Sequence, residues 1–165
     1  MATTKFKGND VHTSGNLPAV GAKAPDFTLV AKDLSEKSLA DFAGKKVVLT
    51  VNPSYDTGVC QATARSFNAK LGGRGDVVVL AVSADLPFAQ SRFCEADGLD
   101  HVVPLSSFRA SFARDYGLEI VDGPLKGLTA RAVIVVGADG KVLSSELVPE
   151  ITNEPDYAQV EAALA

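Results

Sequence analysis

The chain contains no tryptophan, one methionine, two cysteines and two histidines in 165 residues. Cys60, Cys94, His12 and His101 supply enough donors for a zinc ion, but no pair of them has the close spacing that zinc sites normally use. The cysteines form no C-x-x-C motif, which disfavours a dithiol reductase. No glycine-rich segment completes a phosphate-binding or dinucleotide-binding motif. We therefore expect neither a metal nor an organic cofactor.

Long apolar segments are missing as well. The longest runs, residues 77–82 and 132–136, are far shorter than the roughly 20 residues that a membrane-spanning helix requires, and they are typical of buried strands. Residues 1–15 contain no apolar core of a secretory signal, so we expect a cytoplasmic protein. The net charge of -4 and the sequence pI near 5.1 disfavour a nucleic acid or an anionic membrane as partner. Small molecules and proteins are the expected partners.

The composition predicts one globular domain over residues 1–165. Hydrophobic residues make up 46% of the chain and charged residues 22%, and no biased tract suggests a linker. Within residues 1–16, the turn signal Gly8-Asn9-Asp10 separates two short alternating stretches. This pattern predicts a β-hairpin attached to the main fold.

The middle of the chain has the pattern of a βαβ unit followed by a second helix. Strands are predicted at residues 26–31, 45–51 and 76–82, and a helix is predicted at 57–71 with Cys60, Ala64, Phe67 and Leu71 on one face. Gly72 and Gly73 end this helix. Asp85 is expected to cap the next helix, which has Pro87 in its first turn, Cys94 near its end and Gly98 after it.

The last third of the chain predicts two further helices around a β-hairpin. Ser106 or Ser107 can cap a helix that carries Phe108, Phe112 and Tyr116 on one stripe and ends at Gly117. Residues 132–136 and 141–148 flank the turn Ala138-Asp139-Gly140 and are expected to pair antiparallel. Asn153 is expected to cap a final helix. The order of elements predicts the α/β class, with a thioredoxin-like fold in which helices flank a central mixed β-sheet.

The segment Pro53-Ser54-Tyr55-Asp56-Thr57-Gly58-Val59-Cys60 lies where a strand of the βαβ unit passes into its helix, which is where ligands bind in open α/β sheets. If Thr57 is the N-cap, Cys60 is the third helical residue, close to backbone N–H groups that the helix leaves unpaired. These donors and the helix dipole favour the nucleophilic thiolate over the thiol. A buried, inert cysteine on an apolar helix face is the alternative interpretation.

Pro53, Thr57 and Cys60 match the P-x-x-x-T-x-x-C signature of the peroxiredoxins in order and spacing. The stretches PSYDTGVC, SADLPFAQSRFC, DGPLKGLTARAVIVV, EITNEPDY and FTLVAKDL resemble those of the bacterial thiol peroxidase subfamily over nearly the whole chain. The resemblance implies that Cys60 is the peroxidatic cysteine and that Cys94 is its resolving partner. Cytosolic reductants keep thiols reduced, so a disulfide between them is expected to be transient.

The resemblance also implies roles for three other residues. The Thr57 hydroxyl can bridge thiolate and peroxide, although a plain N-cap is the alternative. Arg131 matches the active-site arginine of the family, where a permanent cation stabilises the thiolate; a surface arginine at a strand end is the alternative. Pro53 shapes the approach to the thiol, or simply ends the strand. Asn52 and Tyr55 depart from the apolar residues expected at their positions, and we expect neither to touch the catalytic set.

The expected function is reduction of hydrogen peroxide and organic hydroperoxides through a Cys60 sulfenic acid and a Cys60–Cys94 disulfide. The resemblance points to thioredoxin as the reductant and to a homodimer. A non-enzymatic, thioredoxin-like redox sensor or binding module is the alternative. A cysteine hydrolase would need a histidine beside Cys60, and the sequence alone does not place either histidine.

Overall fold

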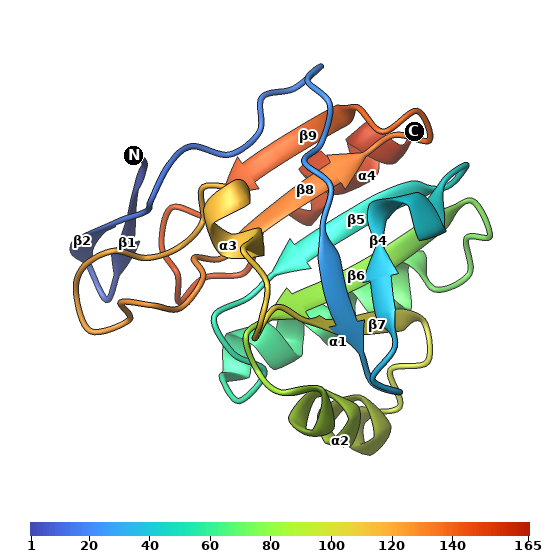
Figure 1. The fold of residues 1–165 in the computed structure, drawn as a ribbon, viewed down its shortest axis with the longest axis horizontal. Helices are drawn as coiled ribbons and strands as arrows, with labels where there is room; N and C mark the ends of the chain where they lie inside the picture. Colours follow the sequence, from blue (N-terminus) through green and yellow to red (C-terminus); the bar gives the residue numbers. More distant parts are fainter.

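A computed structural model describes residues 1–165, and a seven-stranded mixed β-sheet forms its centre (Figure 1). The strand order is β4-β3-β7-β6-β5-β8-β9. The strands are β3 (Thr28–Ala31), β4 (Glu36–Ser38), β5 (Lys46–Val51), β6 (Val77–Ser83), β7 (Val102–Ser106), β8 (Ala132–Val136) and β9 (Val142–Leu147). Strands β5, β6 and β7 are mutually parallel, whereas β8 pairs antiparallel with both β5 and β9. The predicted βαβ unit and the β8–β9 hairpin are confirmed.

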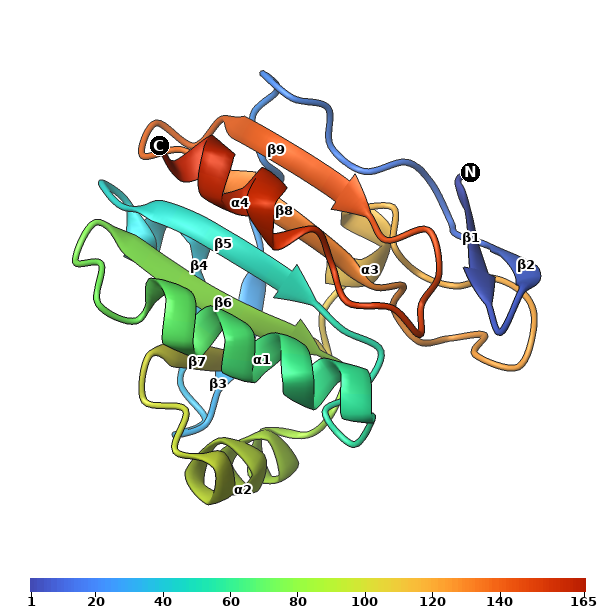
Figure 2. The same ribbon diagram turned by 180° about the vertical axis from the view of Figure 1, so that it is seen from behind.

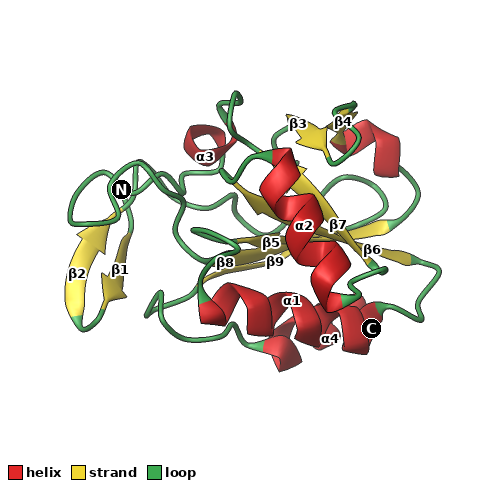
Figure 3. Ribbon diagram, turned by 90° about the horizontal axis from the view of Figure 1, so that it is seen from below, coloured by secondary structure: helices red, strands yellow, loops and turns green.

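Helices α1 (Gly58–Leu71) and α4 (Tyr157–Leu164) lie on one face of this sheet, as Figures 2 and 3 show. Helix α2 (Pro87–Asp97) lies at the border of the sheet against β7 and contributes Cys94 to the core on the same face. The other face is covered by the 3-10 helix η1 (Leu39–Phe42) and the single turn α3 (Phe112–Asp115). The prediction of a central mixed sheet between helices is confirmed. No helix is both long and apolar enough to cross a lipid bilayer.

Alternation along the central strands builds two separate cores. On β5, Val47, Leu49 and Val51 pack under α3 and η1, whereas Val48 faces α1, α2 and α4. Successive side chains of a strand point to opposite faces, so a fully apolar strand fills both cores at once. The same alternation sends every second residue near the end of β5 towards the helix that carries Cys60.

The N-terminal hairpin is present as β1 (Thr3–Phe6) paired with β2 (Asn9–His12). Its turn is not at the predicted Gly8-Asn9-Asp10. Lys7 and Gly8 form a two-residue turn, both with positive φ (51° and 83°), and Asn9 already pairs with Phe6. Two-residue turns of this kind match the twist of the flanking strands, which explains the choice of glycine at position 8.

Two helix starts differ from the prediction. The N-cap of α2 is Leu86 and not Asp85, and the N-cap of α4 is Asp156 and not Asn153. The Asp156 carboxylate accepts the backbone N–H of Gln159, as a capping residue does. Pro87 occupies the first turn of α2 as predicted, and Gly98 ends the helix in the left-handed conformation (φ 62°). The Asp85 side chain is used elsewhere, as described below.

The predicted helix from Ser106 or Ser107 to Gly117 is wrong for most of its length. Ser106 ends strand β7, which the sequence did not predict, and only Phe112–Asp115 is helical, with Ser111 as its N-cap. Phe108 is 45% exposed and contributes nothing to a buried stripe. Strand β4 was also not predicted.

Candidate active site

The segment from Pro53 to Cys60 begins where β5 ends, and α1 starts at the residue that the sequence predicts. Thr57 is the N-cap, with an extended backbone, and its hydroxyl oxygen accepts the backbone N–H of Cys60 at 3.4 Å. Cys60 is the third helical residue and is 1% exposed. The Thr57 hydroxyl donates its own proton to the carbonyl of Ser54 at 3.1 Å. In this state Thr57 therefore acts as a helix cap that fixes the start of α1.

Arg131 places a buried cation against the sulfur of Cys60. Its side chain is 2% exposed, its Nη1 lies 3.2 Å from Cys60 Sγ, and its Nε donates to the carbonyl of Ile151 at 2.8 Å. No carboxylate forms an ion pair with Arg131. A buried, permanently charged guanidinium is costly without an anionic partner. The Cys60 thiolate is the group in contact with it that can supply the negative charge.

Asn52 corrects an expectation from the sequence, because it does touch the catalytic set. Its side-chain Oδ1 accepts from Arg131 Nη1 at 3.1 Å, and its side chain is buried. The register of β5 and β8 explains the contact. Val51 lies opposite Ala132, so the next pair along this antiparallel ladder is Asn52 and Arg131, on the face that carries α1.

The residues between Pro53 and Thr57 are held by one carboxylate. Asp85 Oδ1 accepts from the Ser54 hydroxyl at 2.9 Å, and its Oδ2 accepts from the Tyr55 backbone N–H at 2.7 Å and from the Ser83 hydroxyl at 2.7 Å. Pro53 is buried at the end of β5. Asp85 therefore joins the segment from Pro53 to Cys60 to the loop that leads into α2, the helix of Cys94.

Tyr55 is a buried residue in the segment between β5 and α1. Its ring is 2% exposed, packs 5.1 Å from the ring of Phe93 and donates its hydroxyl to the carbonyl of Ala81 at 2.9 Å. Burial raises the pKa of the Tyr55 phenol well above its ordinary value, and the neighbouring Cys94 and Cys60 raise it further. Tyr55 is therefore within electrostatic reach of both thiols and remains a neutral donor.

Cys94 is a buried thiol in the last turns of α2, and it is not bonded to Cys60. Burial raises the pKa of Cys94 to about 11, against a small opposing effect of Lys32. A cavity of about 120 Å³ lined by Lys32, Cys94 and Leu99 lies beside it. In this state Cys94 is a protonated thiol, whereas Cys60 has an arginine beside its sulfur.

Comparison with known proteins identifies the family of this chain. A family model described as Redoxin matches residues 19–164. Thiol peroxidases of Mycobacterium tuberculosis and Mycobacterium bovis are 53% identical over 165 residues, which covers all of this chain and 98% of each relative. The chain belongs to the thiol peroxidase group of the redoxin family. Membership of this family implies a peroxide substrate and a thiol reductant.

Solved structures resemble this redoxin along its whole length. A peroxiredoxin-like protein from Aquifex aeolicus is 41% identical with a TM-score of 0.94, covering 99% of this chain and 96% of that one. A thiol peroxidase from Chromobacterium violaceum has a TM-score of 0.89 at 23% identity, covering 98% of this chain and 94% of that one, and supports the fold alone. The predicted thioredoxin-like fold is confirmed.

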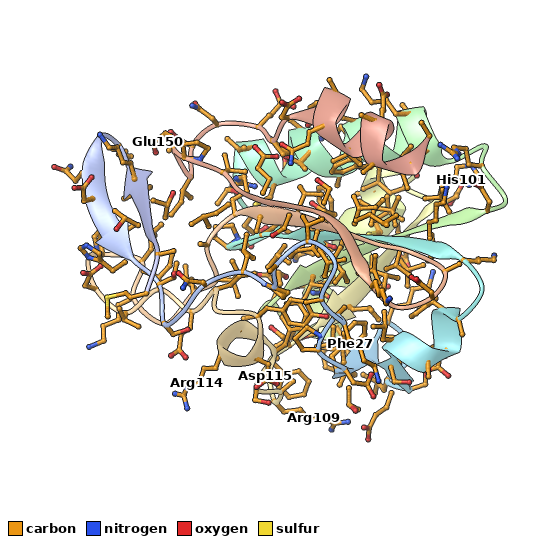
Figure 4. The ribbon with its side chains drawn as sticks, turned by 90° about the horizontal axis from the view of Figure 1, so that it is seen from above. Phe27, His101, Arg109, Arg114, Asp115 and Glu150 are labelled. Atoms are coloured by element: carbon orange, nitrogen blue, oxygen red, sulfur yellow. The ribbon has the colours of Figure 1, made fainter.

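The N-terminal hairpin of this redoxin reaches the site through residues 149–151. The Lys5 N–H donates to the Pro149 carbonyl at 2.9 Å, and the Ile151 N–H donates to the Lys5 carbonyl at 2.8 Å. The Glu150 carboxylate accepts the backbone N–H groups of Lys7 and Gly8 at the hairpin turn, and Figure 4 shows Glu150 beside β1. The Ile151 carbonyl accepts from Arg131 Nε, so Ile151 binds both the hairpin, through its N–H, and the arginine, through its carbonyl.

The two histidines of this redoxin lie away from Cys60. His12 pairs with Asp122 at 2.6 Å in the hairpin region, and the ring of His101 lies against Gly72 at the opposite end of α1 from Cys60. Figure 4 shows His101 far from the hairpin side of the molecule. Neither can serve Cys60 as a general base, which argues against a cysteine hydrolase.

An open pocket of this redoxin lies on the other face of the sheet. It measures about 580 Å³ and is lined by residues that include Phe27, Arg109 and Asp115, which Figure 4 shows together beside α3. None of the predicted site residues contributes to it. The candidate active site is instead a nearly closed contact between Cys60 and Arg131.

Proposed function

We propose that this redoxin is a thiol peroxidase in which Cys60 is the peroxidatic cysteine, Cys94 the resolving cysteine, and Arg131, Thr57 and Pro53 complete the site. The contact of 3.2 Å between Arg131 Nη1 and Cys60 Sγ at the start of α1 carries the proposal. A helix N-terminus and a guanidinium both favour the thiolate, which is the nucleophile. Arg131 Nη2 makes no hydrogen bond within the chain and is free to donate to a peroxide oxygen.

The first step is attack of the Cys60 thiolate on one oxygen of the peroxide. The O–O bond breaks as the S–O bond forms, the leaving oxygen takes a proton and departs as water or an alcohol, and Cys60 becomes a sulfenic acid. Charge develops on the peroxide oxygens during this step, and the Arg131 guanidinium stabilises it. Pro53, buried at the end of β5, keeps the approach to the sulfur narrow.

The second step is condensation of the Cys60 sulfenic acid with the Cys94 thiol, which forms the disulfide and releases one water. A disulfide requires Cα atoms within about 7 Å of each other in a defined orientation. Tyr55 packs against Phe93 of α2, so a movement of α2 that brings the two sulfurs together changes this packing. Partial unwinding of α2 near Cys94 supplies this movement, because the last turns of a helix open at low free-energy cost.

A dithiol protein then reduces the disulfide by thiol exchange, and thioredoxin is the proposed reductant. The active form is a homodimer in the cytoplasm, and residues 1–165 act as one domain. The same chemistry serves antioxidant defence and redox homeostasis.

Cys60→Ser tests the assignment, because it removes the nucleophile and keeps the shape of the site. We expect no measurable peroxide turnover with thioredoxin and thioredoxin reductase in the assay. Peptide mapping of the wild type after one equivalent of peroxide should find one intramolecular Cys60–Cys94 disulfide. Turnover by Cys60→Ser would defeat the assignment, and an interchain disulfide would defeat the proposed role of Cys94.

A redox sensor is the second candidate function, because the burial of Cys94 favours slow resolution of the sulfenic acid. A sensor would react once with peroxide and turn over slowly. Steady-state peroxide consumption with thioredoxin separates the two, since a peroxidase consumes many equivalents of peroxide per chain and a sensor about one.

A further inference from the structure

We propose that Asn52 is a positioning residue of the peroxide reaction: its side-chain carbonyl holds the Arg131 guanidinium in the rotation that points one Nη1 hydrogen at Cys60. Asn52 Oδ1 and Cys60 Sγ lie 3.1 Å and 3.2 Å from the same nitrogen. Nη1 carries two hydrogens, so each acceptor takes one. This inference rests on the proposed peroxidase function and adds a residue to it.

The amide orientation of Asn52 is fixed by its other contact. Asn52 Nδ2 donates to the Thr50 carbonyl at 3.1 Å, which leaves Oδ1 for the guanidinium. The flipped amide would place two donors against a cation and leave the Thr50 carbonyl facing an oxygen. Only one orientation satisfies every group in this buried site.

The backbone of Asn52 is equally constrained. Its N–H donates to the Val82 carbonyl at 2.9 Å, and its carbonyl accepts the Thr129 hydroxyl at 2.7 Å. Thr129 precedes Arg131 by two residues, so Asn52 binds the segment that leads into β8 at two points. A residue tied in this way has little freedom to follow movements of the guanidinium, and it therefore sets where the guanidinium lies.

The orientation of the Arg131 guanidinium depends on these neutral acceptors because no carboxylate binds it. A carboxylate would hold Arg131 more strongly, but it would also neutralise the charge that Cys60 and the peroxide require. Asn52 and the Ile151 carbonyl are neutral acceptors that orient the cation from two sides and leave its charge in place. An apolar residue at position 52 would pack in the site without orienting it.

Two substitutions separate orientation from charge. Asn52→Leu removes the acceptor, and we expect the rate constant for Cys60 oxidation by hydrogen peroxide, followed by stopped-flow fluorescence or quenched mass spectrometry, to fall about tenfold. Asn52→Asp keeps an acceptor of the same shape but introduces a carboxylate beside Arg131. We expect the pH profile of Cys60 alkylation by iodoacetamide to move to higher pH in Asn52→Asp, because the carboxylate competes with the thiolate for the cation.

Ser144→Ala is the control, since Ser144 is a buried polar residue that accepts from Gln159 Nε2 at 3.0 Å and contacts neither Arg131 nor the segment of Cys60. It should leave the oxidation rate of Cys60 within about twofold of the wild type. A wild-type oxidation rate in folded Asn52→Leu, or an unmoved alkylation profile in Asn52→Asp, overturns the proposal. The alkylation profile needs no peroxide, so it reports on Asn52 even if the wild type proves inert to peroxide and the proposed function fails.

Discussion

The surroundings of the two cysteines differ in how firmly they are held. Cys60 lies against the ends of β5 and β8, where Asn52, Arg131 and Ile151 form a continuous set of buried hydrogen bonds. Cys94 lies in a short helix at the border of the sheet, and the residues at the start of that helix, Leu86 and Phe88, are 52% and 66% exposed. Cys60, on the first turn of α1, is thus held against β5, β8 and their hydrogen-bonded neighbours Asn52, Arg131 and Ile151, which we call the rigid region, whereas Cys94 is carried by an element with fewer supports.

This difference suits the two proposed steps. Attack on peroxide depends on exact alignment of a thiolate and a guanidinium, which favours rigid supports. Disulfide formation requires movement, which favours an element of low local stability. Asp85 is the link between the two regions, because it holds both the Ser54–Tyr55 segment and the entry to α2.

The largest expected effect tests the rigid region. Arg131→Met replaces the guanidinium by an apolar chain of similar length, and we expect the rate constant for Cys60 oxidation to fall by about 100-fold or more, because both thiolate and peroxide lose their cation. Stopped-flow measurement with hydrogen peroxide checks it. Arg114→Met, an exposed arginine that pairs with Glu119, is the control and should react like the wild type. If Cys60 in Arg131→Met is oxidised at close to the wild-type rate, Arg131 and its supports have no role in the reaction with peroxide.

Asp85→Asn tests the link between the regions. The substitution removes the charge that accepts three hydrogen bonds, and we expect the free energy of unfolding to fall by about 2 kcal/mol. Urea denaturation of the reduced protein checks this, and hydrogen exchange should show the loss at α2 and at residues 54–55 together. Asp10→Asn, on the exposed hairpin, should change the stability by less than about 0.5 kcal/mol. Loss of protection at α2 alone would show that Asp85 does not couple the two regions.

The burial of Cys94 predicts a dependence of stability on pH. The pKa of Cys94 is about 11 in the folded chain against 9.0 for an unperturbed cysteine, so the thiolate is favoured in the unfolded state. The contribution of the Cys94 thiol to the free energy of unfolding is therefore fully present below pH 9 and is lost as the pH rises from 9 towards 11. At pH 10 the free energy of unfolding is lower by about 1 kcal/mol. The measurement is the difference in urea stability between the wild type and Cys94→Ser from pH 8 to pH 10. A difference that stays constant over this range would mean that Cys94 is already accessible in the reduced protein.

The smallest expected effect concerns a buried hydroxyl of the rigid region that has no hydrogen-bond partner. Thr50 Oγ1 is buried in β5 and has no hydrogen-bond partner. Thr50→Val removes this unpaired hydroxyl, and we expect the free energy of unfolding to rise by up to about 1 kcal/mol. Thermal or urea denaturation checks it, with Thr28→Val on the exposed side of β3 as the control. A loss of stability in Thr50→Val would indicate that the hydroxyl has a partner in solution.

Local sequence patterns predicted the part of the site around Cys60 and the start of α1 well. Thr57 as N-cap, Cys60 in the first turn and the end of α1 at Leu71 all follow from residues close together in the sequence. Asn52 could not be placed in the same way. Its contact with Arg131 depends on the antiparallel register of β5 and β8, which are separated by about half of the chain, and no local pattern encodes that register.

The errors of the sequence-based fold prediction have similar causes. Strand β7 contains Pro104, which normally argues against an inner strand. The structure accommodates Pro104 because β3 pairs only with Leu105 and Ser106 of β7. No β3 residue lies opposite Pro104, so its lack of an N–H breaks no hydrogen bond on that side. Asp85 has the residue type and position of an N-cap, but its carboxylate is taken by a segment 30 residues away. In both cases tertiary contacts outweighed local preference.

The hairpin at the N-terminus gives the assembly of the site an order in time. Thr4 bonds Val148, 144 positions later, and Arg131 follows Cys60 by 71 positions. During synthesis the cysteine leaves the ribosome first, its cation much later, and the segment that ties both to the hairpin almost last. The contact between Cys60 and Arg131 therefore gains its full set of supports only after residues 148–151 have been made and have paired with β1.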